Sequence, residues 1–221
     1  MKLNKTLVLT ALMLITLNLS AQKDEQRNDE GMQYLFDGNL HITGFGGVTV
    51  DLTSIEGDPS VAVGGGGAAV INQKFFIGGY GQGITTIHER KNIAINEEEI
   101  DEAMLQFGHG GLWLGYIIQP ARVLHMNVNA KIGGGELSLN ESLDEYDMFD
   151  SYHRDAVFVM SPSVGVDVNI LPWFRIAANA GYRVVSGVSG KTYDDSDKKI
   201  FKSEDYNGAV FSMSFLFGNF K

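Results

Sequence analysis

Histidine is the residue type in this 221-residue chain best suited to proton transfer or metal binding, and the chain has five. A metal site on extended chain needs a second ligand two residues away or on a neighbouring strand. The sequence has no His-x-His or His-x-Glu pair, and the absence of cysteine removes thiolate ligands, thiol nucleophiles and disulfides. We therefore predict no metal and no cofactor site. We expect His41, His109 and His125 to form hydrogen bonds inside the folded protein, and His88 and His153 to lie in loops.

Nucleophilic catalysis would need a serine and an acidic residue beside a histidine. His125 is followed by Met126 and Asn127, with no serine in place. No triad is visible elsewhere in the chain, so the sequence predicts no catalytic residue and a protein that is not an enzyme.

Carboxylates gather in three segments, and the second and third of these also carry aromatic side chains. Clustered carboxylates can bind hard cations such as Ca²⁺, but EF-hand spacing is absent and solvated surface loops explain the same pattern. The interleaved aromatic residues indicate segments able to contact a protein partner or a polysaccharide. The acidic residues are Glu97, Glu98, Glu99, Asp101, Glu102, Asp144, Glu145, Asp147, Asp150, Asp194, Asp195 and Asp197, and the aromatic ones are Tyr146, Phe149, Tyr152, Tyr193, Phe201 and Tyr206.

The overall composition excludes several classes of protein. A net charge of -10 argues against a nucleic-acid partner, because phosphate binding requires a basic surface. With 44% hydrophobic residues the chain is not disordered. A mean hydropathy of -0.04 excludes a bundle of membrane helices, because no apolar stretch of about 20 residues occurs beyond the N-terminus.

The N-terminal segment has the pattern of a secretory signal. Lys2 and Lys5 precede the apolar run 7–19, which is followed by Ser20-Ala21-Gln22. We predict a signal peptide at 1–21, with a buried N-terminal helix as the alternative, and a flexible polar lead-in at 22–39. The remaining residues, 40–221, form one predicted domain.

From residue 40 onward, apolar and polar residues alternate with a period of two, which predicts β-strands. The clearest stretch is 124–132, where Met126 and Val128 alternate with Asn127 and Asn129. Eight strands are predicted, at 40–53, 60–72, 74–87, 104–118, from 124, 156–170, from 174 and 207–219.

The connections between these strands alternate in length. Tight turns are predicted at 72–73, 119–121 and 171–173, all at one end of the sheet together with both termini. Longer polar loops are predicted at 54–59, 88–103, 137–155 and 188–206, all at the other end. This is the layout of an eight-stranded antiparallel up-and-down transmembrane β-barrel.

The polar face of the predicted strands carries small hydrogen-bonding groups and few charges, whereas the solvated face of a soluble protein is rich in Lys and Glu. This difference favours a polar lumen filled by side chains and an apolar face toward lipid. The charged residues would form ion pairs inside the lumen or line a conduction path; they are Asp51, Lys131, Glu136, Asp167, Arg175 and Arg183. A soluble, lipocalin-like barrel that binds a small apolar ligand is the alternative, although its Gly-x-Trp signature is absent near the first strand.

Aromatic and glycine residues complete the pattern. An aromatic girdle is predicted beside the tight turns, from Phe75, Phe76, Tyr116, Trp173, Phe174, Phe217 and Phe220. The glycines lie in the middle of four consecutive strands, where we expect them to relieve bending and to leave room for Phe45, Tyr80 and Trp113.

The chain resembles the small eight-stranded outer-membrane β-barrel proteins of Gram-negative bacteria. The resemblance rests on the Ala21-Gln22 signal end, on Phe76-Ile-Gly-Gly-Tyr-Gly81 and on the closing strand 211–220. It implies an outer-membrane location, contact with membrane lipids and lipopolysaccharide, and a structural or surface-interaction role. It also implies assembly through the C-terminal strand, although Lys221 follows the expected terminal aromatic. Some barrels of this kind modify lipid A with a histidine, a serine and an acid, a set that is not visible here.

Overall fold

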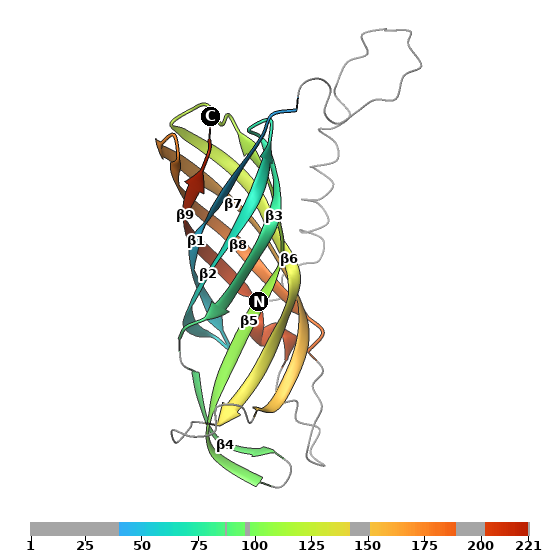
Figure 1. The fold of residues 1–221 in the computed structure, drawn as a ribbon. Helices are drawn as coiled ribbons and strands as arrows, with labels where there is room; N and C mark the ends of the chain where they lie inside the picture. The colour runs from blue at the N-terminus through green and yellow to red at the C-terminus, as the bar shows by residue number, and fades with distance from the viewer. Residues whose placement is uncertain (1–39, 87, 96–97, 142–150, 189–201, 221) are drawn as a thin grey trace, which may run out of the picture. The chain divides into compact units, whose positions relative to one another are not determined.

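In the computed structural model of this protein, the described residues are 40–86, 88–95, 98–141, 151–188 and 202–220. They form one antiparallel β-sheet that closes on itself (Figure 1). The predicted signal peptide at 1–21 and lead-in at 22–39 lie outside the described residues. No helix in the described part of the chain has the length and apolar composition needed to cross a bilayer.

The described residues form nine strand segments, all in this sheet, and one short 3-10 helix, η2. The elements are β1 (Ile42–Ile55), β2 (Asp58–Ile71), β3 (Phe75–Ile84), β4 (His88–Ile95), β5 (Glu98–Ile118), β6 (Leu124–Glu141), β7 (Ser151–Leu171), β8 (Phe174–Ser186), η2 (Ser203–Tyr206) and β9 (Gly208–Gly218).

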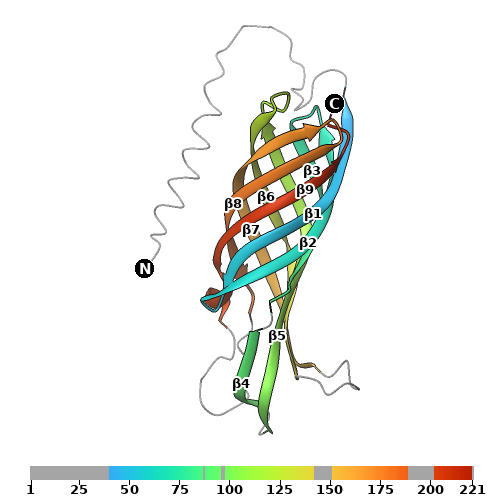
Figure 2. The ribbon, with the colours of Figure 1, turned by 90° about the vertical axis from the view of Figure 1, so that its left-hand side faces the viewer.

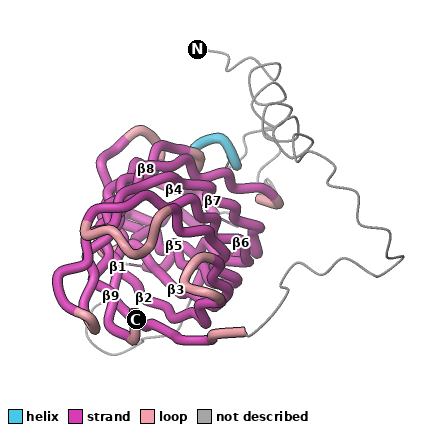
Figure 3. The backbone as a smooth tube through the Cα atoms, turned by 90° about the horizontal axis from the view of Figure 1, so that it is seen from above, coloured by secondary structure: helices cyan, strands magenta, loops and turns pink. Residues whose placement is uncertain are grey.

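The nine segments occupy eight places around a closed barrel. Strands that follow one another in sequence pair, except that β3 pairs with β5 instead of β4, and β1 pairs with β9. β3 and β4 pair with consecutive parts of β5, so the two segments together count as one strand of the barrel. Viewed along the barrel, the strands form a ring (Figure 3). The predicted eight-stranded up-and-down barrel is therefore confirmed.

The two faces of the barrel are apolar outside and largely polar inside. On β6, Met126 and Val128 are exposed, whereas Asn127 and Asn129 are buried. On β9, Phe211 and Met213 are exposed, whereas Ser214 is buried. A soluble barrel has the opposite arrangement, because its exterior contacts water. The lipocalin-like alternative is therefore wrong.

The loop predicted at 54–59 is a tight hairpin. β1 ends at Ile55 and β2 begins at Asp58, which leaves only Glu56 and Gly57 between them. Both residues have positive φ, 55° and 92°, as a two-residue hairpin turn requires. A tight turn therefore lies at each end of the barrel, and the prediction that all tight turns share one end is wrong.

The described parts of the predicted loops 88–103 and 137–155 are strand (Figure 2). β4 and β5 form a hairpin that pairs from His88↔Leu105 to Ile95↔Glu98. β6 continues to Glu141 and β7 begins at Ser151. These segments contain many charged residues and lack the apolar alternation that marks a membrane strand, so the sequence pattern resembled a loop. We call the end of the barrel at which these segments lie the loop end. The opposite end, which carries turns 72–74, 119–123 and 172–173, is the turn end.

The glycines have two different environments. At Gly115, an added Cβ would strike the ring of Phe76, so the glycine makes room for an aromatic side chain, as predicted. At Gly81, an added Cβ would meet nothing within 4 Å. The register pairs Gly65 with Gly81, Gly81 with Gly110, and Gly110 with Gly134. By alternation with their buried neighbours, these four glycines form one row on the outer surface, which we call the glycine row.

Candidate functional site

The middle of the lumen is occupied by a network built on a buried ion pair. Lys131 Nζ lies 3.5 Å from Asp51 Oδ2 and donates a 2.7 Å hydrogen bond to Gln82 Oε1. Gln82 Nε2 donates to the same Asp51 oxygen at 2.9 Å and lies 3.1 Å from His109 Nε2. The other His109 nitrogen lies 3.0 Å from the Tyr80 hydroxyl. The predicted lumenal hydrogen bonding of His109 is confirmed.

A chain of amide side chains continues this network toward the turn end. Asn129 Oδ1 accepts hydrogen bonds from Trp113 Nε1 at 3.3 Å and from the Ser163 hydroxyl at 2.8 Å. Asn129 Nδ2 donates to Asn127 at 2.6 Å and to Asn179 at 3.2 Å. Four strands, β5 to β8, are therefore joined through one buried amide.

A second ionic group lies where the amide chain ends. Asn127 Nδ2 donates a 2.7 Å hydrogen bond to Asp167 Oδ1. The other Asp167 oxygen lies 3.4 Å from His125 Nε2 and 3.7 Å from an Arg175 nitrogen. Arg175 Nε also donates to Asn169 at 2.8 Å. Four of the charged residues predicted in the lumen thus form two groups, Asp51 with Lys131 and Asp167 with Arg175. His125 is buried, as predicted.

Arg183 occupies the loop end of the lumen with only 1% of its surface exposed. Its Nε donates to the Tyr206 main-chain carbonyl at 2.8 Å, and a terminal nitrogen donates to the Ser54 carbonyl at 2.9 Å. The guanidinium carbon lies 5.3 Å from the centre of the Phe107 ring. The hydrogen bonds and ring contact given for this cation are therefore to backbone carbonyls and an aromatic face.

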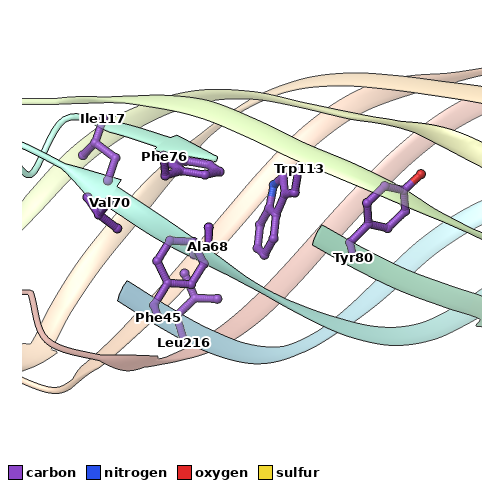
Figure 4. Packing of buried hydrophobic residues seen from close by; sticks show 9 residues of the cluster. Phe45, Ala68, Val70, Phe76, Tyr80, Trp113, Ile117 and Leu216 are labelled. Carbon is purple, nitrogen blue, oxygen red and sulfur yellow. The ribbon is translucent and has the colours of Figure 1, made fainter. Parts of the chain in front are cut away.

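Apolar clusters close the lumen on both sides of the polar network. The turn-end cluster packs aromatic rings edge to face at centroid distances of 5.5–5.6 Å (Figure 4). It comprises Phe45, Ala68, Val70, Phe76, Tyr80, Trp113, Ile117, Ala177 and Leu216, with Phe220 packed against it. The loop-end cluster comprises Ile55, Leu105, Phe107, Leu137, Val157, Val159, Val185 and Tyr206. Side chains therefore fill the lumen, and these residues line no continuous conduction path.

Four residues lie outside the lumen or girdle positions predicted for them. Glu136 faces outward, 54% exposed, and lies 3.7 Å from Arg154. Its position is even-numbered, whereas the inward residues of β6 around Lys131 are odd-numbered. His41 is exposed because it precedes β1. Phe76 and Phe220 pack in the lumen and not in the girdle; of the adjacent pair 75–76, alternation lets only one residue point outward.

The remaining girdle residues lie near the turn end. Tyr116, Trp173 and Phe217 are about half exposed, at 47%, 55% and 47%. The Phe174 and Phe217 rings stack at 5.1 Å, and Trp173 stacks on Phe217 at 6.3 Å. These exposed rings lie where amphipathic aromatic side chains meet a membrane surface.

Sequence reasoning missed Gln82, which joins the ion pair to His109. Its amide supplies both a donor and an acceptor, a role that neither a charge pattern nor a motif reveals. The alternation around it, with Tyr80 on the same face of β3, was the available signal.

At the loop end, one side of the barrel wall continues beyond the rest. β5 pairs with β6 as far as Ala103↔Glu141, and β6 pairs with β7 as far as Asn140↔Ser151. The β7–β8 pairing begins only at Phe158, and β3 has ended at Ile84. We call this four-stranded part of β4, β5, β6 and β7 the extended sheet. Within the described residues, β4 pairs only with β5, so its other edge is unpaired.

The acidic segments and their aromatic residues remain mostly a prediction. The positions 97, 142–150 and 189–201 lie outside the described residues. His88 and His153 lie in β4 and β7 and not in the loops predicted for them. Among the described residues, no group of three or more His, Asp or Glu is placed to hold a metal ion.

An apolar exterior, a girdle at one end and a filled polar interior define an eight-stranded transmembrane β-barrel. No family model and no curated protein matches the sequence. Among solved structures, Neisserial surface protein A (NspA) is similar in fold, with a TM-score of 0.53. The match covers 83% of this chain and all of NspA, at 9% identity. The attachment invasion locus protein Ail of Yersinia pestis, solved alone and with the heparin analogue sucrose octasulfate, has TM-scores of 0.42 and 0.43. It is 10% identical, and the match covers 80% of this chain and 96% of Ail. The chain therefore has the fold of small outer-membrane barrels.

Proposed function

We propose that this protein is an outer-membrane surface protein that binds an extended partner strand at the free edge of β4. The observation that carries the proposal is the extended sheet, which continues the wall past the barrel and has a β4 edge that pairs with no other described strand. An unpaired edge presents a row of backbone N–H and C=O groups to any added strand. The filled lumen leaves the loop end as the surface on which interaction takes place.

In the orientation that we propose, the turn end lies in the periplasm and the extended sheet lies outside the cell. The chain is exported with a signal peptide at 1–21, which is then cleaved. Lipids and lipopolysaccharide contact the apolar exterior, and the closing strand β9 engages the assembly machinery. The absence of cysteine makes the orientation directly testable. Asn92→Cys on β4 should react with an impermeant maleimide on intact cells, whereas Ala121→Cys should react only after the outer membrane is opened. The reverse pattern would contradict the orientation.

Strand addition is tested with peptides selected for binding to the barrel in lipid nanodiscs. A selected peptide should lose binding when alternate backbone nitrogens are methylated, because methylation removes the donors that pair with an edge. Replacement of residues 88–103 by a short turn should abolish binding of the unmethylated peptide. Equal binding of both peptide forms, or full binding to the shortened barrel, would refute the β4 edge as the site.

We propose no enzymatic activity. The lumenal histidines are held by other partners: His125 Nδ1 faces the Arg122 carbonyl at 3.0 Å, and His109 faces Tyr80 and Gln82. Neither has a serine hydroxyl beside it among the hydrogen bonds of the described residues. A lipid A-modifying activity is tested by the mass of lipid A from cells with and without the protein, and a mass change would overturn this part of the proposal.

A further inference from the structure

Asp51 lies on β1 and belongs to the lumenal network, with only 3% of its surface exposed. Its Oδ2 accepts the hydrogen bonds of Gln82 and Lys131. Its Oδ1 is also buried and has no hydrogen-bond partner among the residues that the structure describes. A buried carboxylate oxygen is expected to have a partner, because removing it from water is costly unless a donor replaces the water.

A cavity of about 20 Å³ lies against this carboxylate. Space of this size holds one water molecule, provided that two to four polar groups line it. The polar residues that line it include Asp51, Lys131, Asn129, Asn179, Ser161 and Ser212.

The sheet is interrupted at the wall of the same cavity. The β7–β8 register runs from Met160↔Val184 directly to Ser163↔Gly181, so the two intervening residues of β7 make no ladder pair with β8. One of them is Pro162, which has no N–H to donate. Pro162 and Gly181 both line the cavity. The interruption places backbone groups of β7 and β8 next to a space bordered by the Asp51 carboxylate.

We propose that this cavity binds one long-lived water molecule, which donates a hydrogen bond to Asp51 Oδ1 and bridges it to the β7–β8 side of the lumen. The occupant is neutral because the Asp51 carboxylate already interacts with two cations, Lys131 and Arg183. The Lys131 ammonium 3.5 Å from Asp51 balances the carboxylate, so a cation would add an uncompensated charge. An anion would be repelled by the same carboxylate.

The proposal is tested by NMR of the barrel in deuterated lipid nanodiscs, with cross-relaxation between water and backbone amides as the measurement. The amide of Gly181 should show NOE and ROE cross-peaks to water of opposite sign, as slowly tumbling bound water produces. Absence of these cross-peaks in the unmodified protein would overturn the proposal.

A pair of variants separates bound water from proton exchange through a serine hydroxyl. Ser212→Ala removes the hydroxyl without filling the cavity, and the cross-peaks at Gly181 should remain. Ser212→Val removes the same hydroxyl but fills the space with methyl groups, and the cross-peaks should fall to background. Loss in both variants, or retention in both, would refute the bound water. If Ser212→Val fails the heat-modifiable gel shift that reports folding, the pair Ser161→Ala and Ser161→Val gives the same test.

Discussion

Arg183 Nε donates a 2.8 Å hydrogen bond to the main-chain carbonyl of Tyr206, which fastens the last residue of η2 to strand β8 inside the loop end. The turn between β1 and β2 adds two hydrogen bonds: Glu56 N–H donates to the Asp205 carbonyl at 2.7 Å, and the Tyr206 hydroxyl donates to Glu56 at 3.4 Å. Tyr206 is fully buried as a result. The lumen is therefore closed by a segment that returns to the barrel and is bonded to it.

Replacement of Arg183 by methionine should lower the free energy of unfolding by about 3 kcal/mol, because two hydrogen bonds from a charged donor are lost and carbonyls stay buried. Unfolding in urea from lipid vesicles measures this change. Arg154→Met is the matched control. The Arg154 pair with Glu136 is 3.7 Å long and more than half exposed, so its loss should cost less than about 1 kcal/mol. Equal losses would show that Arg183 is not a structural clamp.

The pair of Asp51 and Lys131 should behave as one unit. Either Asp51→Asn or Lys131→Met leaves a buried charge without its partner and should destabilise the barrel by about 3–5 kcal/mol. The double variant should cost clearly less than the two single losses added together, because no uncompensated charge remains. Additive losses in this double-mutant cycle would mean that the two charges do not interact.

The two glycine environments predict opposite tolerance of a methyl group. Gly115→Ala should destabilise the barrel by about 1–3 kcal/mol, because the new Cβ overlaps the Phe76 ring. Gly81→Ala should change stability by less than about 1 kcal/mol, because its Cβ enters open space. Urea midpoints of the two variants decide the matter, and a greater loss at Gly81 would contradict the assignment of faces.

The filled lumen should not conduct ions. Planar bilayers containing the reconstituted protein should show no conductance steps, and Phe107→Ala should remain silent because the turn-end cluster still blocks the lumen. Protein recovered from the same proteoliposomes must show the folded gel mobility, so that silence reflects a closed barrel and not failed insertion. Steps in the unmodified protein would disprove the closure.

The fold was predictable wherever side chains mark the two faces. The alternation of β6 is visible directly in the sequence, where apolar Met126 and Val128 alternate with polar Asn127 and Asn129. The apolar pair faces outward and the polar pair faces inward, as predicted. The alternation of inward and outward residues could not be followed across 133–135, because three glycines carry no side chain to mark a face. Glu136 was consequently predicted to face the lumen. The hairpin at Glu56 was missed because its turn depends on backbone dihedral angles, which the polar sequence 54–59 does not reveal.

The polar network was predictable as a class of interaction but not as a set of partners. Asp51, Lys131 and Gln82 come from three strands that are distant in sequence, and their contact depends on the register of a closed sheet. The extension of β4 and β5 was not predicted because strands in water lack the apolar face by which membrane strands are identified.

The glycine row gives the barrel an outer surface that is uneven around its circumference. Gly65, Gly81, Gly110 and Gly134 follow one another across β2, β3, β5 and β6, so the main chain there lies flush with the surface. Elsewhere residues such as Phe211 and Met213 project outward. Two of the strands that carry the glycine row, β5 and β6, also continue into the extended sheet. The outer surface of the barrel therefore differs from one side to another within the plane of the bilayer. A neighbouring molecule in the membrane meets main chain on the side of the glycine row and projecting side chains elsewhere.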